Sequence, residues 1–210
     1  MKQNKGNRGI IFDFGKVLLD WDVRYLYRNY FPDSQSLENF LVEINFYEWN
    51  NRHDAHPTLV AGIEEQVKKY PHWEKLIRLY DEFYPLSLQG AIDGSVRILR
   101  QLYEQGHPLY GLSNFNSAKF ASIKPQYPFF EFFDAIVLSG DAGVVKPNPK
   151  IFEILLEWID RGASECIFID DSFPNVQSAL ALGFDAIHFK SPELLAGDLM
   201  DRGFNLVLKD

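Results

Sequence analysis

The chain has 210 residues, of which 46% are hydrophobic and 24% are charged, a balance that is typical of a globular protein with a sizeable core. Its formal net charge of -8 argues against binding to nucleic acid, which needs a continuous patch of lysine and arginine. A phosphorylated ligand would therefore have to be bound by a local cluster of donors together with a cation.

Short apolar runs separated by helical spacing run through most of the chain. The runs predict buried parallel strands over residues 9–14, 109–113, 135–138, 166–169 and 186–189. Helices are predicted over residues 95–105, 149–158 and 175–182. This alternation predicts an α/β fold with a doubly wound parallel sheet, in which the ligand site lies beyond the carboxyl ends of the strands.

The segment between the first and second predicted strands is far longer than a usual connection of about a dozen residues. It is rich in aromatic residues at helical spacing, which predicts a small helical bundle with most of these rings in its interior. We therefore expect two domains: an α/β core of residues 1–20 and 90–210, and an inserted helical cap of residues 21–89.

Polar side chains follow four of the predicted elements at the same edge of the sheet. They are Asp13 after the first strand, Ser113 and Asn114 after the second, Lys146 in the loop after the third, and Asp170 and Asp171 after the fourth. Each alone has an ordinary explanation, such as a helix cap or a solvent-exposed lysine. Together they predict a catalytic site, and the adjacent carboxylates, which repel each other without compensation, predict a metal ion.

Four ordered motifs resemble those of the haloacid dehalogenase superfamily. They are IIFDFGKVL at residues 10–18, LSN at 112–114, VKP at 145–147 and FIDDSFPN at 168–175. The resemblance covers nearly the whole chain. It implies a Rossmann-like core, a cap inserted after the first motif, and Mg²⁺-dependent hydrolysis of a phosphate ester through an aspartyl-phosphate.

The resemblance also implies roles for the residues that carry out the chemistry. Asp13 would attack phosphorus as the nucleophile, and Lys146 would offset the negative charge on Asp13 and on the transferred group. Ser113 and the backbone of Asn114 would bind the phosphoryl oxygens.

The metal site follows from the same motifs. Asp13, Asp171 and the carbonyl of Gly15 would hold Mg²⁺ through hard oxygen ligands. Asp170 and Asn175 would support these ligands from a second layer or through water.

Gly15 is a departure from the motif, because phosphatases of the superfamily usually carry an aspartate at this position. That aspartate protonates the leaving group and then activates water, and losing such a group costs about 10² to 10⁴ in rate. The sequence is also similar to family members with glycine here that include phosphatases of sugar phosphates. It therefore predicts a phosphatase of small phosphorylated metabolites, with a hexose 1-phosphate as one candidate. The leaving group of a hexose 1-phosphate would need little protonation, or Asp20 or Asp22 would assist in its protonation.

Two other functions stay open. A metal-independent 2-haloacid dehalogenase also lacks the second aspartate, but the acidic pair at Asp170 and Asp171 would repel an anionic haloacid. A binding or regulatory protein could keep the fold without turnover, although it would not need the nucleophile Asp13. Hydrolysis of an aryl phosphate with Mg²⁺ would separate the phosphatase from both.

The histidines of the predicted cap carry little information about a metal. His53 and His56 are three residues apart with no third ligand, and Pro57 favours a loop, so we expect both histidines to be exposed. If this stretch faces the cleft, residues 52–54, which include Asp54, would contact the substrate.

Cys166 is the single cysteine, so no disulfide within the chain is possible, and its apolar neighbours predict a buried thiol. The N-terminus is polar, and nowhere do about 18 uninterrupted apolar residues occur. We expect a cytoplasmic protein that does not bind membranes, and the sequence leaves its oligomeric state open.

Overall fold

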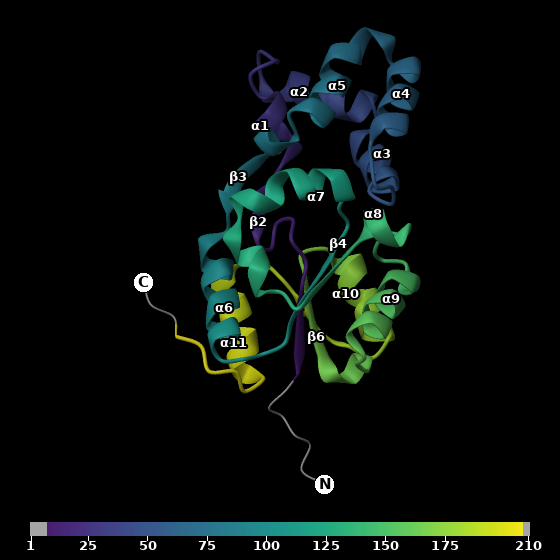
Figure 1. The fold of residues 1–210 in the computed structure, drawn as a ribbon. Coiled ribbons are helices and arrows are strands. Elements are labelled where there is room, and N and C mark those ends of the chain that lie inside the picture. Colours follow the sequence, from purple (N-terminus) through teal and green to yellow (C-terminus); the bar gives the residue numbers. More distant parts are fainter. Residues whose placement is uncertain (1–7, 208–210) are drawn as a thin grey trace.

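Five parallel strands form the central sheet of the computed structural model, which describes residues 8–207 (Figure 1). The strand order is β5-β4-β1-β6-β7, so the first strand of the chain lies at the centre. The bounds are β1 Gly9–Phe12, β4 Leu109–Ser113, β5 Ala135–Leu138, β6 Cys166–Asp170 and β7 Asp185–His188. The predicted doubly wound parallel sheet is confirmed.

Helices cover both faces of this sheet, which explains why its strands are apolar at consecutive positions. Ile10 and Phe12 of β1 pack in one hydrophobic cluster, whereas Ile11 between them packs in the cluster on the opposite face. The buried thiol of Cys166 lies in this second cluster, as predicted. Figure 1 shows α6 (Asp93–Glu104) and α11 (Pro192–Asp201) on one side, with α9 (Pro149–Ile159) and α10 (Phe173–Ala181) on the other.

The ends of these helices follow from local chemistry. The side chains of Asn148 and Ser191 accept hydrogen bonds from backbone N–H groups in the first turns of α9 and α11. Gly183 follows α10 with a φ of 90°, a conformation that glycine adopts without strain. The three helices that were predicted in the core, α6, α9 and α10, begin and end within two residues of their expected bounds.

The chain leaves the sheet after β1 and returns before α6 through a two-stranded antiparallel ribbon that the sequence pattern did not predict. Its strands are β2 (Leu19–Trp21) and β3 (Leu88–Ala91), paired at Leu19 with Ala91. Both expected domain boundaries fall inside this ribbon, and the division into two domains stays a prediction.

Five α-helices lie between the strands of the ribbon, gathered beyond the carboxyl ends of the sheet strands (Figure 1). We call this segment the inserted helices. They are α1 Val23–Tyr27, α2 Ser34–Glu43, α3 Phe46–His53, α4 Val60–Lys69 and α5 Glu74–Glu82, with the 3₁₀ turns η1 Pro71–Trp73 and η2 Tyr84–Ser87.

Aromatic rings fill much of the interior of the inserted helices, as their spacing predicted. Tyr27 packs edge-on against Phe40 with ring centroids 5.1 Å apart, and Phe46 packs in the same way against Tyr80 at 4.9 Å. All four side chains are buried.

Shorter elements complete the core. They are α7 Ser117–Ile123, α8 Ser139–Ala142, η3 Lys124–Gln126, η4 Pro128–Phe132 and η5 Ala163–Glu165. Within residues 8–207, no helix combines the length and the apolar character needed to cross a membrane.

Candidate active site

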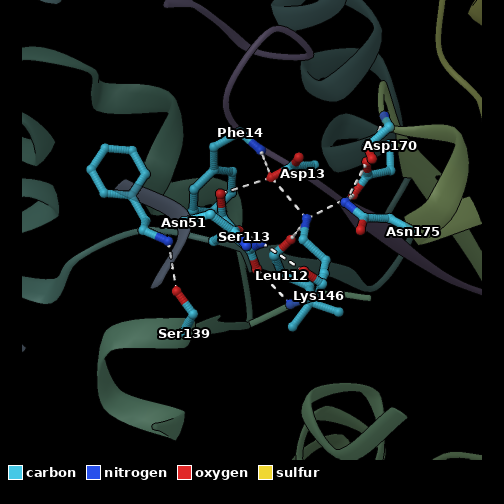
Figure 2. Close-up of polar contacts among 12 residues, drawn as sticks. Asp13, Phe14, Asn51, Leu112, Ser113, Ser139, Lys146, Asp170 and Asn175 are labelled. Carbon is cyan, nitrogen blue, oxygen red and sulfur yellow. Dashed lines mark hydrogen bonds and ion pairs between the residues drawn. The ribbon is translucent and has the colours of Figure 1, made fainter. Parts of the chain in front are cut away.

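Three of the predicted site residues meet because their strands are neighbours in the sheet. The strands β4, β1 and β6 lie side by side and end at the same edge, which brings Ser113, Asp13 and Asp170 together (Figure 2). The hydroxyl of Ser113 donates a hydrogen bond to Oδ1 of Asp13 at 2.7 Å, although 100 residues separate them in the chain.

Lys146 enters this group from the loop between α8 and α9. Its Nζ lies 3.0 Å from Oδ1 of Asp13 and 2.7 Å from Oδ2 of Asp170, and it donates to the carbonyl of Leu112 at 2.7 Å. The lysine side chain is buried. Burial lowers its pKa, but the charges of the two carboxylates outweigh this effect and raise the pKa above its usual value.

Asn114 fixes the backbone of this lysine. Its side-chain oxygen accepts a hydrogen bond from the N–H of Lys146 at 2.7 Å, and its side-chain nitrogen donates to the carbonyl of Lys146 at 3.0 Å. The side chain of Asn114 is thus committed to positioning Lys146.

The loop after β1 fixes the carboxylate of Asp13. The N–H of Phe14 donates to Oδ1 of Asp13 at 2.7 Å, and the carbonyl of Phe14 accepts hydrogen bonds from the N–H groups of the turn at residues 17–19. Lys16, with a φ of 59°, makes this turn tight enough to return the chain to β2. Burial raises the pKa of Asp13 to about 6, against the opposing charge of Lys146.

A carboxylate cluster lies beside the lysine. Asp13, Asp170 and Asp171 each offer an oxygen, and these oxygens all lie within 4.8 Å of one another. Asp170 is already compensated, since it accepts hydrogen bonds from Lys146 and from Nδ2 of Asn175 at 3.0 Å.

Asp171 differs from Asp170 in its partners. Its carboxylate accepts no hydrogen bond from another side chain of residues 8–207, and burial followed by the charge of Asp13 raises its pKa. Hard oxygen ligands with uncompensated charge are those that Mg²⁺ takes. Asp13 and Asp171 therefore offer oxygens of the kind that bind a divalent cation.

A cavity of about 100 Å³ opens between this cluster and the inserted helices. Asp13, Gly15 and Ser113 line it from the core. The remaining lining residues include several that no sequence motif indicated: Trp21, Asn50, Tyr80, Tyr84, Phe115 and Lys119. Lys119 gave no signal in the sequence, because a lysine on a short helix is usually exposed, yet its side chain here is only 5% exposed.

One prediction for the inserted segment was wrong. His53 is not exposed in a loop but lies buried at the end of α3, with Nδ1 2.8 Å from the carbonyl of Trp49. His56 is exposed, as expected, and Arg52 forms a surface ion pair with Glu65. Of residues 52–54, only Asp54 lines the cavity.

The two carboxylates proposed to assist at Gly15 lie elsewhere. Oδ1 of Asp20 accepts a hydrogen bond from the hydroxyl of Tyr25 at 2.9 Å. Asp22 accepts from the N–H of Arg24 in the first turn of α1 and pairs with its guanidinium. Neither aspartate lines the cavity.

Hydrogen bonds hold the end of α3 against the core. The hydroxyl of Ser139 donates to the carbonyl of Asp54 at 2.6 Å, and the N–H of Ala118 donates to the carbonyl of Pro57 at 3.0 Å. The side chain of Asn116 donates to the carbonyl of His56. The wall of the cavity formed by the inserted helices is therefore fixed relative to the nucleophile.

Comparison with known proteins agrees with the geometry. The sequence model of the family of haloacid dehalogenase-like hydrolases matches residues 7–183. The sesquiterpene phosphatase astK of Aspergillus oryzae is 34% identical over 188 residues, which cover 86% of this chain and 89% of that protein. This chain belongs to the haloacid dehalogenase-like hydrolases. The phosphatases among its relatives support a hydrolase that acts on phosphate monoesters.

Two further family members show how widely the fold is used. The glyceraldehyde 3-phosphate phosphatase of Pyrococcus abyssi is 27% identical over 65% of this chain and 64% of its own length. The magnesium complex of the family enzyme bt-2542 from Bacteroides thetaiotaomicron superposes with a TM-score of 0.70 at 21% identity, over 89% of this chain and 94% of that chain. The second similarity confirms the fold alone.

Proposed function

We propose that this protein is a Mg²⁺-dependent phosphatase that hydrolyses small phosphorylated metabolites through an aspartyl-phosphate on Asp13. The observation that carries the proposal is the set of donors around this one carboxylate. Lys146, Ser113 and the N–H of Phe14 all reach Oδ1 at 3.0 Å or less, at the floor of a cavity. These donors fix the orientation of the nucleophile, and they lie where the oxygens of a phosphoryl group on Asp13 would need them.

Two displacements at phosphorus complete the reaction. The carboxylate of Asp13 forms a bond to phosphorus while the bond to the ester oxygen breaks, which releases the alcohol. Water then attacks phosphorus, and the bond to Asp13 breaks. Lys146 offsets the charge in both steps, and the hydroxyl of Ser113 and the N–H of Asn114 bind phosphoryl oxygens.

The metal ion would be held by Asp13, Asp171 and the carbonyl of Gly15. When bound there, Mg²⁺ supplies positive charge against the phosphoryl oxygens. Asp170 and Asn175 then act indirectly, because Asp170 orients Lys146 and Asn175 donates to both carboxylate oxygens of Asp170.

The cavity of about 100 Å³ is lined by both apolar and polar groups. Aromatic walls at Trp21 and Phe115 and polar groups at Asn50 and Lys119 suit a small polyol better than a long hydrocarbon. A sugar phosphate such as a hexose 1-phosphate is therefore the first candidate, and a cytoplasmic location stays part of the proposal.

A single substrate screen tests the function. The purified protein is incubated with an aryl phosphate, hexose and triose phosphates, a fifteen-carbon prenyl monophosphate and 2-chloropropionate, each with Mg²⁺ or with EDTA. We expect phosphate release from the aryl and sugar esters only with Mg²⁺, and none from the Asp13→Asn control. Chloride release in EDTA would identify a dehalogenase instead. Binding of sugar phosphates without any turnover would identify a binding protein.

A further inference from the structure

The position of the usual general acid is open in this protein. A Cβ atom added to Gly15 would meet no other atom within 4 Å, so the space beside the nucleophile is unfilled. Among the residues that line the cavity, Asp54 is the one carboxylic acid besides Asp13. It reaches the cavity from the inserted helices, on the side opposite the sheet.

Neighbours from two directions fix Asp54. It follows the last residue of α3, and its Oδ2 accepts a hydrogen bond from Nδ2 of Asn50 at 2.9 Å, one turn earlier. Its carbonyl accepts from Ser139 of the core at 2.6 Å. The side chain therefore keeps its place relative to Asp13 without help from a substrate.

The surroundings of Asp54 favour its protonated form. Burial raises its pKa well above the usual value, and the negative end of the α3 dipole acts in the same direction. Lys119 on α7, the backbone of Asn116 and the side chain of Asn50 oppose this shift and so stabilise the carboxylate once the proton has left. A group that is stable in both states can give up a proton and take one back.

The aromatic groups that face Asp54 add no charge. The hydroxyls of Tyr80 on α5 and Tyr84 on η2 have pKa values raised well above normal, mainly by burial, so both stay neutral near pH 7. The hydroxyl of Tyr80 also donates to Oδ1 of Asn50 at 2.7 Å. Tyr80, Asn50 and Asp54 thus form a hydrogen-bonded series that orients the carboxyl.

Lys119 is a poorer candidate for the acid. Its ammonium donates to the carbonyl of Tyr80 at 3.0 Å and to Asp81 at 3.2 Å. It also lies over the rings of Tyr80 and Tyr84, 4.5 and 4.6 Å from their centroids. These contacts hold the ammonium in the wall of the cavity.

We propose that Asp54 is the general acid and base of this phosphatase, taking the place of the carboxylate that is missing at Gly15. The inference rests on the proposed function. As the bond from Asp13 to phosphorus forms and the ester bond breaks, Asp54 gives its proton to the leaving oxygen, and an alcohol departs. The carboxylate of Asp54 then takes a proton from the water that attacks phosphorus. Cleavage of the bond to Asp13 releases phosphate and restores both aspartates.

The test compares leaving groups. We measure kcat/KM with Mg²⁺ for an aryl phosphate, whose leaving group needs no proton, and for a primary alkyl phosphate, whose leaving group does. Asp54→Asn should lower the alkyl value by about 10² to 10⁴ and leave the aryl value within about threefold. Adding Gly15→Asp to this variant should recover much of the alkyl activity. Asp81→Asn, which also removes a carboxylate near Lys119 but lies outside the cavity, should change neither value.

The outcomes separate this inference from the proposed function. If the natural protein does not hydrolyse the aryl phosphate with Mg²⁺, the proposed function itself fails. If aryl hydrolysis is present but Asp54→Asn lowers both esters equally, or neither, Asp54 is not the acid.

A measurement on the natural protein covers the case in which Asp54→Asn does not fold. As pH rises and Asp54 loses its proton, kcat/KM for the alkyl ester should fall relative to that for the aryl ester. Titration of Asp13 acts on both esters, so the ratio reports the groups that assist the leaving oxygen. A ratio that stays constant with pH would overturn the proposal.

Discussion

Two buried lysines, one at the edge of the sheet and one under the inserted helices, have pKa values that are shifted in opposite directions. Lys146 lies within 3.0 Å of the two carboxylates of Asp13 and Asp170, and its pKa is raised. Lys119 has a single carboxylate partner, Asp81, whose side chain is 43% exposed. Burial lowers the pKa of Lys119 to about 8. Both residues are buried lysines, so the direct contacts with carboxylates explain why their pKa values shift in opposite directions.

The carboxylates of the two regions differ in the same way. Asp13 has a lysine and a hydroxyl bonded directly to one oxygen, which limits the rise of its pKa to about 6. Asp54 accepts a hydrogen bond from the neutral amide of Asn50, and burial raises its pKa well above the usual value, with the charge of Lys119 opposing the shift. A direct cation beside Asp13 therefore favours its ionised form, whereas Asp54, which lacks such a contact, is shifted towards its protonated form.

The largest expected effect on activity follows from replacing the nucleophile Asp13, and it is compared with the effect of replacing Asp54. Asp13→Asn should lower kcat for every phosphate ester to below about 1% of the natural value, because no route avoids the nucleophile. Asp54→Asn should have an effect of this size on kcat/KM only for poor leaving groups, because kcat/KM reports the step that forms the aspartyl-phosphate. The measurement is steady-state phosphate release, with circular dichroism as the folding control. Activity of Asp13→Asn above this level, after deamidation has been excluded, would contradict the assignment of the nucleophile.

The two lysines should also differ in how much they contribute to the free energy of unfolding, and replacing each of them by methionine tests this. Lys146→Met leaves two buried carboxylates without their cation and should lower the free energy of unfolding by about 3 to 5 kcal/mol. Lys119→Met puts an apolar chain between two aromatic rings and leaves only the half-exposed Asp81 unpaired, so its cost should be below about 1 kcal/mol. Urea unfolding at pH 7 in EDTA measures both. Equal losses would show that the two lysines are compensated alike.

The affinity for Mg²⁺ distinguishes the proposed direct ligand Asp171 from the supporting residue Asn175. Asp171→Ala should weaken Mg²⁺ binding more than about 100-fold, since a direct ligand and its charge are lost. Asn175→Ala, which only removes hydrogen bonds to Asp170, should weaken binding about tenfold. Titration calorimetry gives both constants. Equal affinities for the two variants would mean that the direct and indirect ligands are assigned wrongly.

The smallest expected effect is the pH dependence that Lys119 gives to stability. Folded Lys119 loses its proton at a pKa of about 8, whereas the usual value in an unfolded chain is 10.5. Between these values the unfolded chain binds more protons, so the stability of the natural protein should rise with pH relative to Lys119→Met. At pH 9 the gain should be about 1 kcal/mol. Unfolding free energies from pH 7 to 9.5 test this, and a constant difference between the two proteins would contradict it.

The sequence predicted the core well because its signals are local. Strands buried on both faces give continuous apolar runs, as in residues 166–169, and helices that end at Gly106 or Gly183 have visible stop signals. The ribbon of β2 and β3 gave no such signal, since each strand has only three or four residues and pairs with a partner about 70 residues away.

The sequence by itself determined which residues gather at the sheet edge. Parallel strands all end on one side, so the polar groups after β1, β4 and β6 had to meet there whatever the details of packing. Only the tertiary structure decided the opposite wall of the cavity. Helical spacing shows which face of α3 or α7 is buried, but not what that face packs against. The places of Asp54 and Lys119, and with them their pKa shifts, depend on contacts between elements that are distant in sequence.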